Sequence, residues 1–551
     1  MAQAIQAEYE IVLINNILDS VHGMIGLTEV ENEIERKPIF KRLQDISQLG
    51  LVKRIFPCAL HNRYVHSLGV MYVVDKMASK LRLTGDERQI VRLAGLLHDI
   101  GHYPFSHDIE TVYKSFYTAK PKVKGLPLPT TCDKINKITG VQKIDMELSG
   151  HMTDKYHHES IGALVIRHNR DIRKAISEHY VENSPMLRNR FTDLGGKEAV
   201  VDAVLDDIAS IVVGNCQHES KLFPEKYTLF VQMMHSELDA DNIDYLLRDA
   251  AFSGTTYGVM DMHQLIDTIC ERTVEFNMPN SDHQTQTERK KQAHHIMGVT
   301  PKGIGYVDQF MINRYFAYGQ VINNKYVSIL GAMLRHVVEW FLENGKDKYP
   351  FADIEEMASA QDDSQFLAFT DSAIMALINN SQQLSFAFDP LTQRIVNALR
   401  RYQAFSLSGD NSDKTYSAKG NAALYDSLIK ESDGVYPDLL RLIEAIEEYN
   451  RSGRIDEKRA EELVTESFAF QVEIRPLTKQ LPKGEYLSIL SSSHQLENET
   501  YLYDRLMNGI PVFFPTLQEG SEPELIVERP ESILRENYKL KYLKLRHYSV
   551  N

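Results

Sequence analysis

The stretch LLHDIGHYPFSH, Leu96–His107, places three histidines and one aspartate within twelve residues, directly after an apolar run. A buried imidazole or carboxylate loses its hydration, which is unfavourable unless each group finds a partner. A divalent cation can be that partner, because neutral imidazoles and carboxylates are both common metal ligands. The stretch therefore predicts a polar centre inside a helical protein, with further ligands supplied from elsewhere in the chain.

Helical periodicity surrounds this stretch. From His66 to Leu81 apolar residues recur every three or four positions, which is typical of a helix with one buried face. Thr84 and Glu87 have the spacing of a capping box, so a second helix should begin there and end at Pro104.

His98 and His102 are four residues apart, so on one helix they would share a face, with Asp99 one step round. His66, at the start of the preceding helix, is a candidate to join them. Further downstream, HSELDADNIDYLLRDAAF (235–252) repeats polar side chains every four residues on the face opposite its apolar residues. It predicts an amphipathic helix whose polar face is unusually rich in mixed charge.

Between these segments, YHHES (156–160) adds two more histidines and an acid. A single helical histidine, an isolated His-Asp pair or an acidic helix face is more often an ordinary surface or core feature than part of a site. Their combination in one chain is the signal, and it indicates a metal or catalytic centre.

Length and composition limit the class of protein to which the chain can belong. With 551 residues, of which 43% are apolar, the chain exceeds one ordinary core, and a change of composition after ENGKDKYP predicts domains at 1–345 and 346–551. The net charge of −15 makes a dedicated nucleic-acid-binding protein the weakest interpretation. Four dispersed cysteines, no membrane-length apolar run and no signal-peptide pattern at the N-terminus favour a reduced cytoplasmic protein.

The expected fold class is mainly α, a helical catalytic body with a small β-ribbon between about 270 and 308 and an α+β C-terminal portion. In that portion DSAIMALINN, TQRIVNALRRYQAF and PDLLRLIEAIEEYNRSG read as helices, and FAFQVEIRPL and IPVFFPTL as strands. The basic, proline-rich YKSFYTAKPKVKGLPLPTT reads as a loop or lid; with ERKKQAHH it is the only feature that favours nucleic acid.

The motifs HNRYVHSLGV, LAGLLHDIGHYPFSH, YHHES and LDADNIDYLLRD resemble the successive signatures of the HD-domain phosphohydrolases. Within them they are most similar to the deoxynucleoside-triphosphate triphosphohydrolases. The similarity extends from about residue 19 to about residue 380. It implies an HD-domain fold and the release of triphosphate from a nucleoside triphosphate.

The resemblance also implies roles for single residues. Metal ligands would be His66, His98, Asp99 and Asp241, a donor set that suits Mn, Mg, Fe, Co or Ni. A second, catalytic cluster would contain His102, His107, Glu110 and His158, with His107 as general acid for the departing 5′-oxygen. Glu110 stands where the nearest relatives have a shorter acid.

Matching positions imply a substrate-binding set of Gln48, Leu49, Arg63, Tyr245, Asp249, Arg314, Tyr318 and Ile322. In this set Arg63 and Arg314 would grip phosphates, because a planar guanidinium suits bidentate phosphate contacts. The sugar would lie against Gln48 and Leu49, and its 3′-hydroxyl against Tyr245 and Asp249.

Several positions depart from the family pattern. Asn242 replaces a phosphate-binding lysine and Tyr318 replaces a histidine, while Ile322 falls where vertebrate members carry a tyrosine that crowds the 2′-hydroxyl. Selectivity for deoxyribose over ribose is therefore open. The activator pocket of vertebrate members is also not preserved, since its counterparts here are Arg36, Lys41 and Gln44; no activation by GTP is expected.

The leading hypothesis is a metal-dependent (deoxy)nucleoside-triphosphate triphosphohydrolase in which water attacks the α-phosphorus. One alternative keeps the site but changes the substrate to a nucleoside monophosphate, a ribonucleotide or a cyclic nucleotide. Another is a catalytically idle nucleotide sensor. Relatives assemble as dimers to hexamers, so a homo-oligomer is expected.

Overall fold

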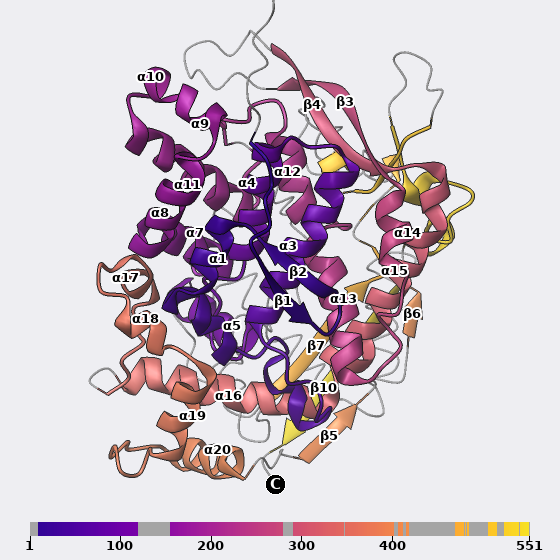
Figure 1. Cartoon of the computed structure of the whole chain (residues 1–551). Coiled ribbons are helices and arrows are strands. Elements are labelled where there is room, and N and C mark those ends of the chain that lie inside the picture. Colours follow the sequence, from indigo (N-terminus) through magenta and orange to yellow (C-terminus); the bar gives the residue numbers. More distant parts are fainter. Residues whose placement is uncertain are drawn as a thin grey trace, which may run out of the picture.

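The computed structural model is dominated by helices (Figure 1). It describes residues 9–118, 155–216, 218–278, 290–345 and 348–401, and, further on, 406–410, 415–417, 469–478, 480, 482–483, 505–507, 509–514, 523–538 and 540–549. Within these ranges the mainly helical fold class with small sheets is confirmed. No helix in them is long and apolar enough to cross a lipid bilayer.

The central helices begin where the sequence places their caps. Helix α3 (Arg63–Lys80) begins after Asn62, whose side chain accepts a hydrogen bond from the Val65 N–H. Helix α4 (Gly85–Leu97) begins with the expected capping box of Thr84 and Glu87. Helix α13 (Ala240–Ser253) is capped by Asp239 and packs against α3. These three helices carry the motifs of the candidate site.

A short antiparallel hairpin precedes them. Strands β1 (Asn15–Asp19) and β2 (Gly23–Leu27) pair in register from Asn15 opposite Leu27 to Asp19 opposite Gly23. Gly23 has a φ of +73°, a conformation that glycine adopts without strain. The hairpin is followed by α1 (Glu29–Glu35), α2 (Pro38–Lys41) and two 3₁₀ turns, Arg42–Asp45 and Gly50–Arg54.

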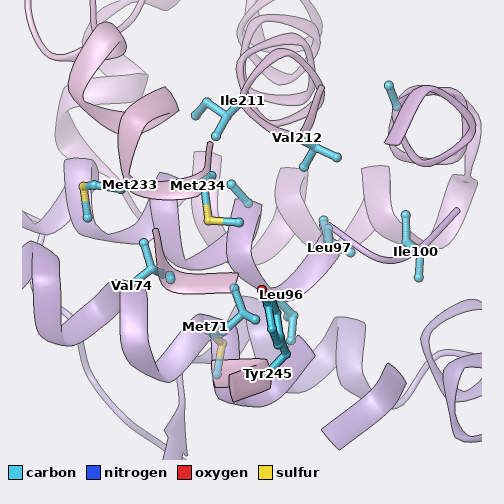
Figure 2. Close-up of a cluster of buried hydrophobic side chains, with 14 of the residues drawn as sticks. Met71, Val74, Leu96, Leu97, Ile100, Ile211, Val212, Met233, Met234 and Tyr245 are labelled. Atoms are coloured by element: carbon cyan, nitrogen blue, oxygen red, sulfur yellow. The ribbon is translucent and has the colours of Figure 1, made fainter. Parts of the chain in front are cut away.

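More helices surround the centre. They are α5 (His107–Thr118), α7 (His158–His168), α8 (Arg170–Ile176) with a π-turn at Ser177–Val181, α9 (Pro185–Asn189), α10 (Phe191–Leu194), α11 (Lys197–Val212), α12 (Tyr227–Met234) and α14 (Met262–Asp267). Helix α11 packs against both α4 and α7. Apolar side chains of α3, α4, α11 and α12 meet in the buried core, which contains Met71, Val74, Leu96, Leu97, Ile211, Val212, Met233 and Met234 (Figure 2).

The expected β-ribbon is confirmed. Strands β3 (Ile269–Met278) and β4 (Lys290–Val299) form an antiparallel hairpin that projects from the body (Figure 1). Two short C-terminal strands, β8 (Pro511–Val512) and β9 (Glu524–Leu525), continue this sheet in the order β3-β4-β8-β9. A second sheet contains β5 (Ser406–Asp410), β6 (Thr415–Ser417), β7 (Ala469–Pro476) and β10 (Leu540–Ser549).

Helices return after the ribbon, as expected. Helix α15 (Ile304–Ala317) passes through a π-turn at Tyr318–Ile322 to α16 (Lys325–Asn344). The remaining α-helices within the described residues are α17 (Ile354–Ser359), α18 (Ser364–Ala368), α19 (Asp371–Asn379), α20 (Pro390–Arg400) and α26 (Leu534–Asn537). The segments DSAIMALINN, TQRIVNALRRYQAF, FAFQVEIRPL and IPVFFPTL hold a helix or strand of the expected kind, whereas PDLLRLIEAIEEYNRSG lies outside the described residues.

Two local expectations are wrong. Helix α4 ends at Leu97 instead of at Pro104, and the chain continues as turns in which the His102 N–H donates to the Asp99 carbonyl at 2.9 Å. Gly101 packs directly against helix α7, where a Cβ would lie 2.1 Å from the Gly162 nitrogen. His98 and His102 therefore do not share the face of one helix.

The second wrong expectation concerns the start of the loop or lid segment. Its first residues, Tyr113–Thr118, belong to helix α5, and the rest of the segment lies outside the described residues.

Candidate active site

His66 lies in the first turn of α3 and is fully buried. Its Nε2 atom is 2.9 Å from Asp241 Oδ1 and 3.3 Å from His98 Nε2. The three side chains come from α3, from the residue that ends α4 and from the first turn of α13. One ligand atom of each lies within 4.8 Å of the others, so these residues form a group able to hold a metal ion.

Hydrogen bonds to the outer ring nitrogens orient both imidazoles of this group. His98 Nδ1 is 2.8 Å from the Gly95 carbonyl oxygen, and His66 Nδ1 is 2.7 Å from Asp244 Oδ2. A carbonyl or carboxylate oxygen only accepts, so both Nδ1 atoms carry hydrogen and both Nε2 atoms point toward the centre of the group. That is the orientation in which an imidazole ligates a metal through Nε2.

Electrostatics within the group suit a cation. Burial lowers the pKa of His66, but the hydrogen bonds to Asp241 and Asp244 outweigh it and raise that pKa to about 10. In Asp241 burial acts to raise the pKa, and the contact with His66 lowers it below its usual value. The carboxylate of Asp241 is thus ionised at neutral pH, and a cation that binds here displaces the proton from His66 Nε2.

Asp99 is almost fully buried beside this group. Its Oδ2 atom is 3.7 Å from His66 Nε2 and 3.5 Å from His98 Nε2, and it accepts a hydrogen bond from Arg63 Nη1 at 2.8 Å. Burial by itself raises the pKa of Asp99, but the Arg63 guanidinium and the neighbouring imidazoles hold it well below its usual range. The structure therefore places an ionised carboxylate next to the three ligand atoms.

A second group lies on the other side of Asp99. It contains His102, His107, Glu110 and His158, each with a ligand or proton-bearing atom within 4.8 Å of the others. The Nε2 atoms of His102 and His158 are each 4.0 Å from Asp99 Oδ1, and their rings stack with centroids 4.3 Å apart. Asp99 thus stands between the two groups, with one oxygen facing each.

Glu110 is the centre of the second group. Its carboxylate accepts from His107 Nδ1 at 2.7 Å, from His158 Nδ1 at 3.1 Å and from the His158 backbone N–H at 3.1 Å, and Lys114 Nζ is 3.1 Å away. Burial acts to raise the pKa of Glu110, but the imidazoles of His158 and His107 hold it well below its usual range. Glu110 is therefore ionised and orients two imidazoles at once.

Two histidines of this group, His107 and His102, differ in their exposure to solvent. The His107 side chain is 68% exposed, whereas His102 is fully buried. Burial, followed by the nearby Arg63 charge, lowers the pKa of His102 well below its usual value. Its Nε2 atom has no hydrogen-bond partner among the described residues. His102 is therefore neutral at physiological pH, and His107 is the group's accessible imidazole.

The expected substrate-binding residues fall into two sets. In the first, Arg63 is only 5% exposed and is held by Asp99, by Ser106 Oγ at 3.0 Å and by the Gln48 carbonyl at 3.4 Å. Gln48 is buried and Leu49 packs against a small apolar cluster that includes Val321. The guanidinium of Arg63 thus braces Asp99 directly, a contact that sequence spacing did not indicate.

In the second set, Arg314 Nε lies 3.1 Å from the Tyr245 hydroxyl, and the Tyr245 and Tyr318 rings meet edge to face at 6.2 Å. Ile322 ends the π-turn that follows α15 and is half-buried. Asp249, one turn after Tyr245 on α13, is held by His61 Nε2 at 2.8 Å. Helices α13 and α15 therefore bring Tyr245, Arg314 and Tyr318 together.

Sequence reasoning missed several residues of this region. Asp244 lies between the polar positions of α13, and Asp19 and His22 belong to the N-terminal hairpin, yet all three are buried or half-buried next to the site. Asp244 lies on the same helix as Asp241, three residues after it, and this spacing was the one sequence feature that could have indicated Asp244. His61, five residues before His66, also belongs to this region through its contact with Asp249.

Comparison with known proteins agrees with this geometry. Residues 63–194 match the family model of the HD domain. The chain is 25% identical over 364 residues to an uncharacterized protein of Methanocaldococcus jannaschii, a match that covers 66% of this chain and 57% of that protein. It is 37% identical over 102 residues to the deoxynucleoside triphosphate triphosphohydrolase SAMHD1 homolog of Dictyostelium discoideum, covering 17% of this chain and 20% of the relative.

The chain thus spans little more than half of the first relative and a fifth of the second. A crystal structure of a phosphohydrolase from Bacteroides thetaiotaomicron superposes with a TM-score of 0.52 at 17% identity, over 98% of this chain and all of that one. At this identity the match establishes a shared fold. On the family match and these relationships, residues 63–194 form an HD domain, and the chain is homologous over a short part of its length to the SAMHD1 triphosphohydrolases.

Proposed function

We propose that this protein is a metal-dependent hydrolase that converts (deoxy)nucleoside triphosphates to nucleoside and inorganic triphosphate. The observation that carries the proposal is the convergence of His66, His98 and Asp241 from three distant segments, with Asp99 beside them. The activity for which the SAMHD1 relatives are named supports the choice of substrate.

His66, His98, Asp99 and Asp241 would hold the ion. The donor set fits one: two imidazoles present Nε2, and both carboxylates are ionised, Asp99 in a buried position and Asp241 in a partly exposed one. Mixed nitrogen and oxygen ligands without thiolates favour Mn, Mg, Fe, Co or Ni. When bound, such an ion supplies Lewis-acid polarisation of a phosphoryl oxygen and a water of lowered pKa.

His107 would protonate the departing 5′-oxygen. Glu110 accepts from His107 Nδ1, which fixes the ring and leaves Nε2 to carry the transferable proton. The exposure of His107 gives a substrate access to it, in contrast with the buried His102. His158 and Lys114, which also contact Glu110, would tune how strongly it holds the His107 proton.

Arg314 would bind a phosphate, and Tyr245 and Asp249 the sugar. Arg314 Nε contacts the Tyr245 hydroxyl, and Arg314 Nη1 lies 4.0 Å from Glu237. The rest of the sugar-binding surface would consist of Gln48, Leu49, Tyr318 and Ile322. Arg63 would act on phosphate only by sharing its guanidinium with Asp99, its partner in this structure.

A ribonucleoside triphosphate is the second candidate substrate. Ile322 has no hydroxyl and a smaller side chain than the tyrosine of vertebrate members, so it offers less hindrance to a 2′-hydroxyl.

From the family resemblance, we also propose that the protein is a homo-oligomer between dimer and hexamer. Light scattering after size-exclusion chromatography tests this oligomeric state.

The deciding experiment incubates the purified protein with each dNTP and NTP in the presence of Mn²⁺ or Mg²⁺ and separates products by ion-exchange chromatography. Release of triphosphate with nucleoside is the expected result. Pyrophosphate or phosphate as product would identify a different reaction. Nucleotide binding without any product would identify a sensor. An Asp241→Asn variant is the control for metal-dependent turnover.

A further inference from the structure

A buried network of charges lies behind His66, on the side away from the candidate metal position. The Asp244 carboxylate is its centre and accepts four hydrogen bonds. Oδ2 accepts from His66 Nδ1 at 2.7 Å and from Arg248 Nε at 2.9 Å, and Oδ1 accepts from His22 Nε2 at 2.6 Å and from Arg248 Nη2 at 3.0 Å. An ionised carboxylate offers about four acceptor positions, so this one is saturated.

The network extends to the N-terminal hairpin β1–β2. Arg248 Nη1 donates to Asp19 Oδ2 at 2.7 Å, and Asp19 Oδ1 accepts from the backbone N–H of Val21 and of His22 in the hairpin turn. The His22 ring stacks on Tyr72 of α3 with centroids 4.8 Å apart. The hairpin is therefore fixed to α3 and α13 through the same carboxylate that contacts His66.

Close packing leaves these groups no alternative position. Gly69 lies one turn after His66 on α3, and a Cβ there would be 2.0 Å from Asp244 Oδ1 and 2.3 Å from Arg248 Nη2. Side-chain exposure is zero for His66, Asp244 and Arg248 and 3% for Asp19. A buried ion pair that is fully hydrogen-bonded and closely packed holds its members in one geometry.

We propose that Asp244 is the positioning residue of the metal centre, and that the β1–β2 hairpin, through Asp19 and His22, is a structural part of that centre. Asp244 holds the hydrogen of His66 on Nδ1, so that the Nε2 lone pair faces the ion. Arg248 and the hairpin hold Asp244. The inference rests on the proposed function, because it assumes that His66 ligates a metal.

The chemical reason is the choice between two imidazole tautomers. Partners that fix the tautomer and orientation of a metal-ligating histidine typically contribute a factor of about 10–100 to metal affinity. An Asp244→Asn substitution keeps the size of the side chain but leaves one acceptor oxygen for four donors. Whichever way the amide turns, His66 or Arg248 loses its partner, and an amide N–H turned toward His66 favours the tautomer with hydrogen on Nε2.

The test measures Mn²⁺ affinity of the full-length protein by isothermal titration calorimetry, at a temperature where each variant is folded by circular dichroism. Asp244→Asn should weaken Mn²⁺ binding about 10–100-fold. Asp19→Asn, which acts indirectly through Arg248 and the hairpin turn, should weaken it less, by about two- to tenfold. Both variants leave His66, His98, Asp99 and Asp241 unchanged.

Asp75→Asn is the matched control. Asp75 lies on the same helix as His66 and pairs with Arg88 Nη2 at 2.8 Å and Arg92 Nη1 at 3.2 Å, and neither contact involves the metal cluster. Its loss should lower the melting temperature and leave Mn²⁺ affinity within about twofold of the wild type. General destabilisation would instead weaken binding in all variants in proportion to the lost stability.

Unchanged Mn²⁺ affinity in Asp244→Asn, or an equal loss in Asp75→Asn, would overturn the inference while leaving the proposed function standing. If Asp244→Asn does not fold, Asp19→Asn decides, and wild-type affinity in that variant overturns the role of the hairpin and of the network. A wild-type protein that binds no Mn²⁺ would remove the proposed function and this inference together.

Discussion

The two histidine groups of this site use the same residue types but differ in what surrounds them. In the group of His66, His98 and Asp241, both outer ring nitrogens donate to fixed oxygens, and the inner nitrogens face one another and a carboxylate. In the group around Glu110, the carboxylate is central and the imidazoles of His107 and His158 point their Nδ1 atoms toward it.

Under the proposed function, this difference separates two chemical tasks. Nitrogens that converge with a carboxylate leave lone pairs for a cation, whereas imidazoles arranged around a carboxylate hold and pass protons. Asp99 faces both groups, with Oδ2 toward the first and Oδ1 toward the second. A carboxylate accepts from Nδ1 in both groups, Asp244 from His66 and Glu110 from His107, so the difference lies at Nε2, which faces the Asp241 carboxylate in His66 and belongs to an exposed side chain in His107.

Removal of the first group's carboxylate should have the largest effect. Asp241→Ala should abolish high-affinity metal binding and lower turnover by at least about a thousandfold, since a bound metal supplies several kcal/mol of transition-state stabilisation. Metal content by mass spectrometry and hydrolysis of dNTPs measure the two effects. Asp206→Ala, in an exposed pair with Arg167, is the control. Full turnover in Asp241→Ala would refute the ligand assignment.

A substitution in the second group should affect turnover without affecting metal binding. His107→Ala should lower turnover about 10²–10⁴-fold, the usual contribution of a general acid, and leave metal affinity unchanged. Calorimetric titration with Mn²⁺ and steady-state kinetics on the same preparation separate the two quantities. Loss of the metal in this variant would mean that His107 is a ligand and that the division between the groups is wrong.

A smaller effect is expected at the proposed sugar-binding position Ile322. Ile322→Tyr should reduce turnover of ribonucleotides relative to deoxynucleotides by roughly tenfold, because the added ring would crowd a 2′-hydroxyl. The measurement is the ratio of kcat/KM for a matched ATP and dATP pair. An unchanged ratio would show that Ile322 does not contact the sugar.

The smallest expected effect is on stability. Burial and Arg63 lower the pKa of His102 below the unfolded value of about 6.5. The folded state then binds fewer protons than the unfolded state below that pH, so stability should fall as pH drops from about 6.5 toward the lowered pKa. Urea unfolding between pH 7.5 and 5 should show a shallower decline for His102→Gln than for the wild type.

The interpretation of that slope depends on the neighbouring groups. His66 and His157 have raised pKa values, so their contribution is fully present below pH 6.5 and is lost only as pH rises through their folded pKa. Glu110 has a lowered pKa and changes stability only at more acidic pH. Equal slopes in the two proteins would show that His102 is not held neutral in the fold.

Much of this protein follows from its sequence because the decisive patterns are local. The capping box at Thr84, the apolar stripe of α3 and the alternating hairpin at β3–β4 each depend on neighbours within a few residues. A family resemblance carried by four short motifs named His66, His98 and Asp241, which the structure brings within 4.8 Å of one another.

Only the tertiary structure decided which of those residues belong to the first group and which to the second. The end of α4 at Leu97 separates His98 from His102, because Gly101 must pass close to α7, a contact between segments some sixty residues apart. Likewise Arg63 turns to Asp99, and Asp244 meets both His66 and the hairpin. The periodicity of a helix determines which face a side chain occupies, but which of two ring nitrogens meets which carboxylate depends on long-range packing.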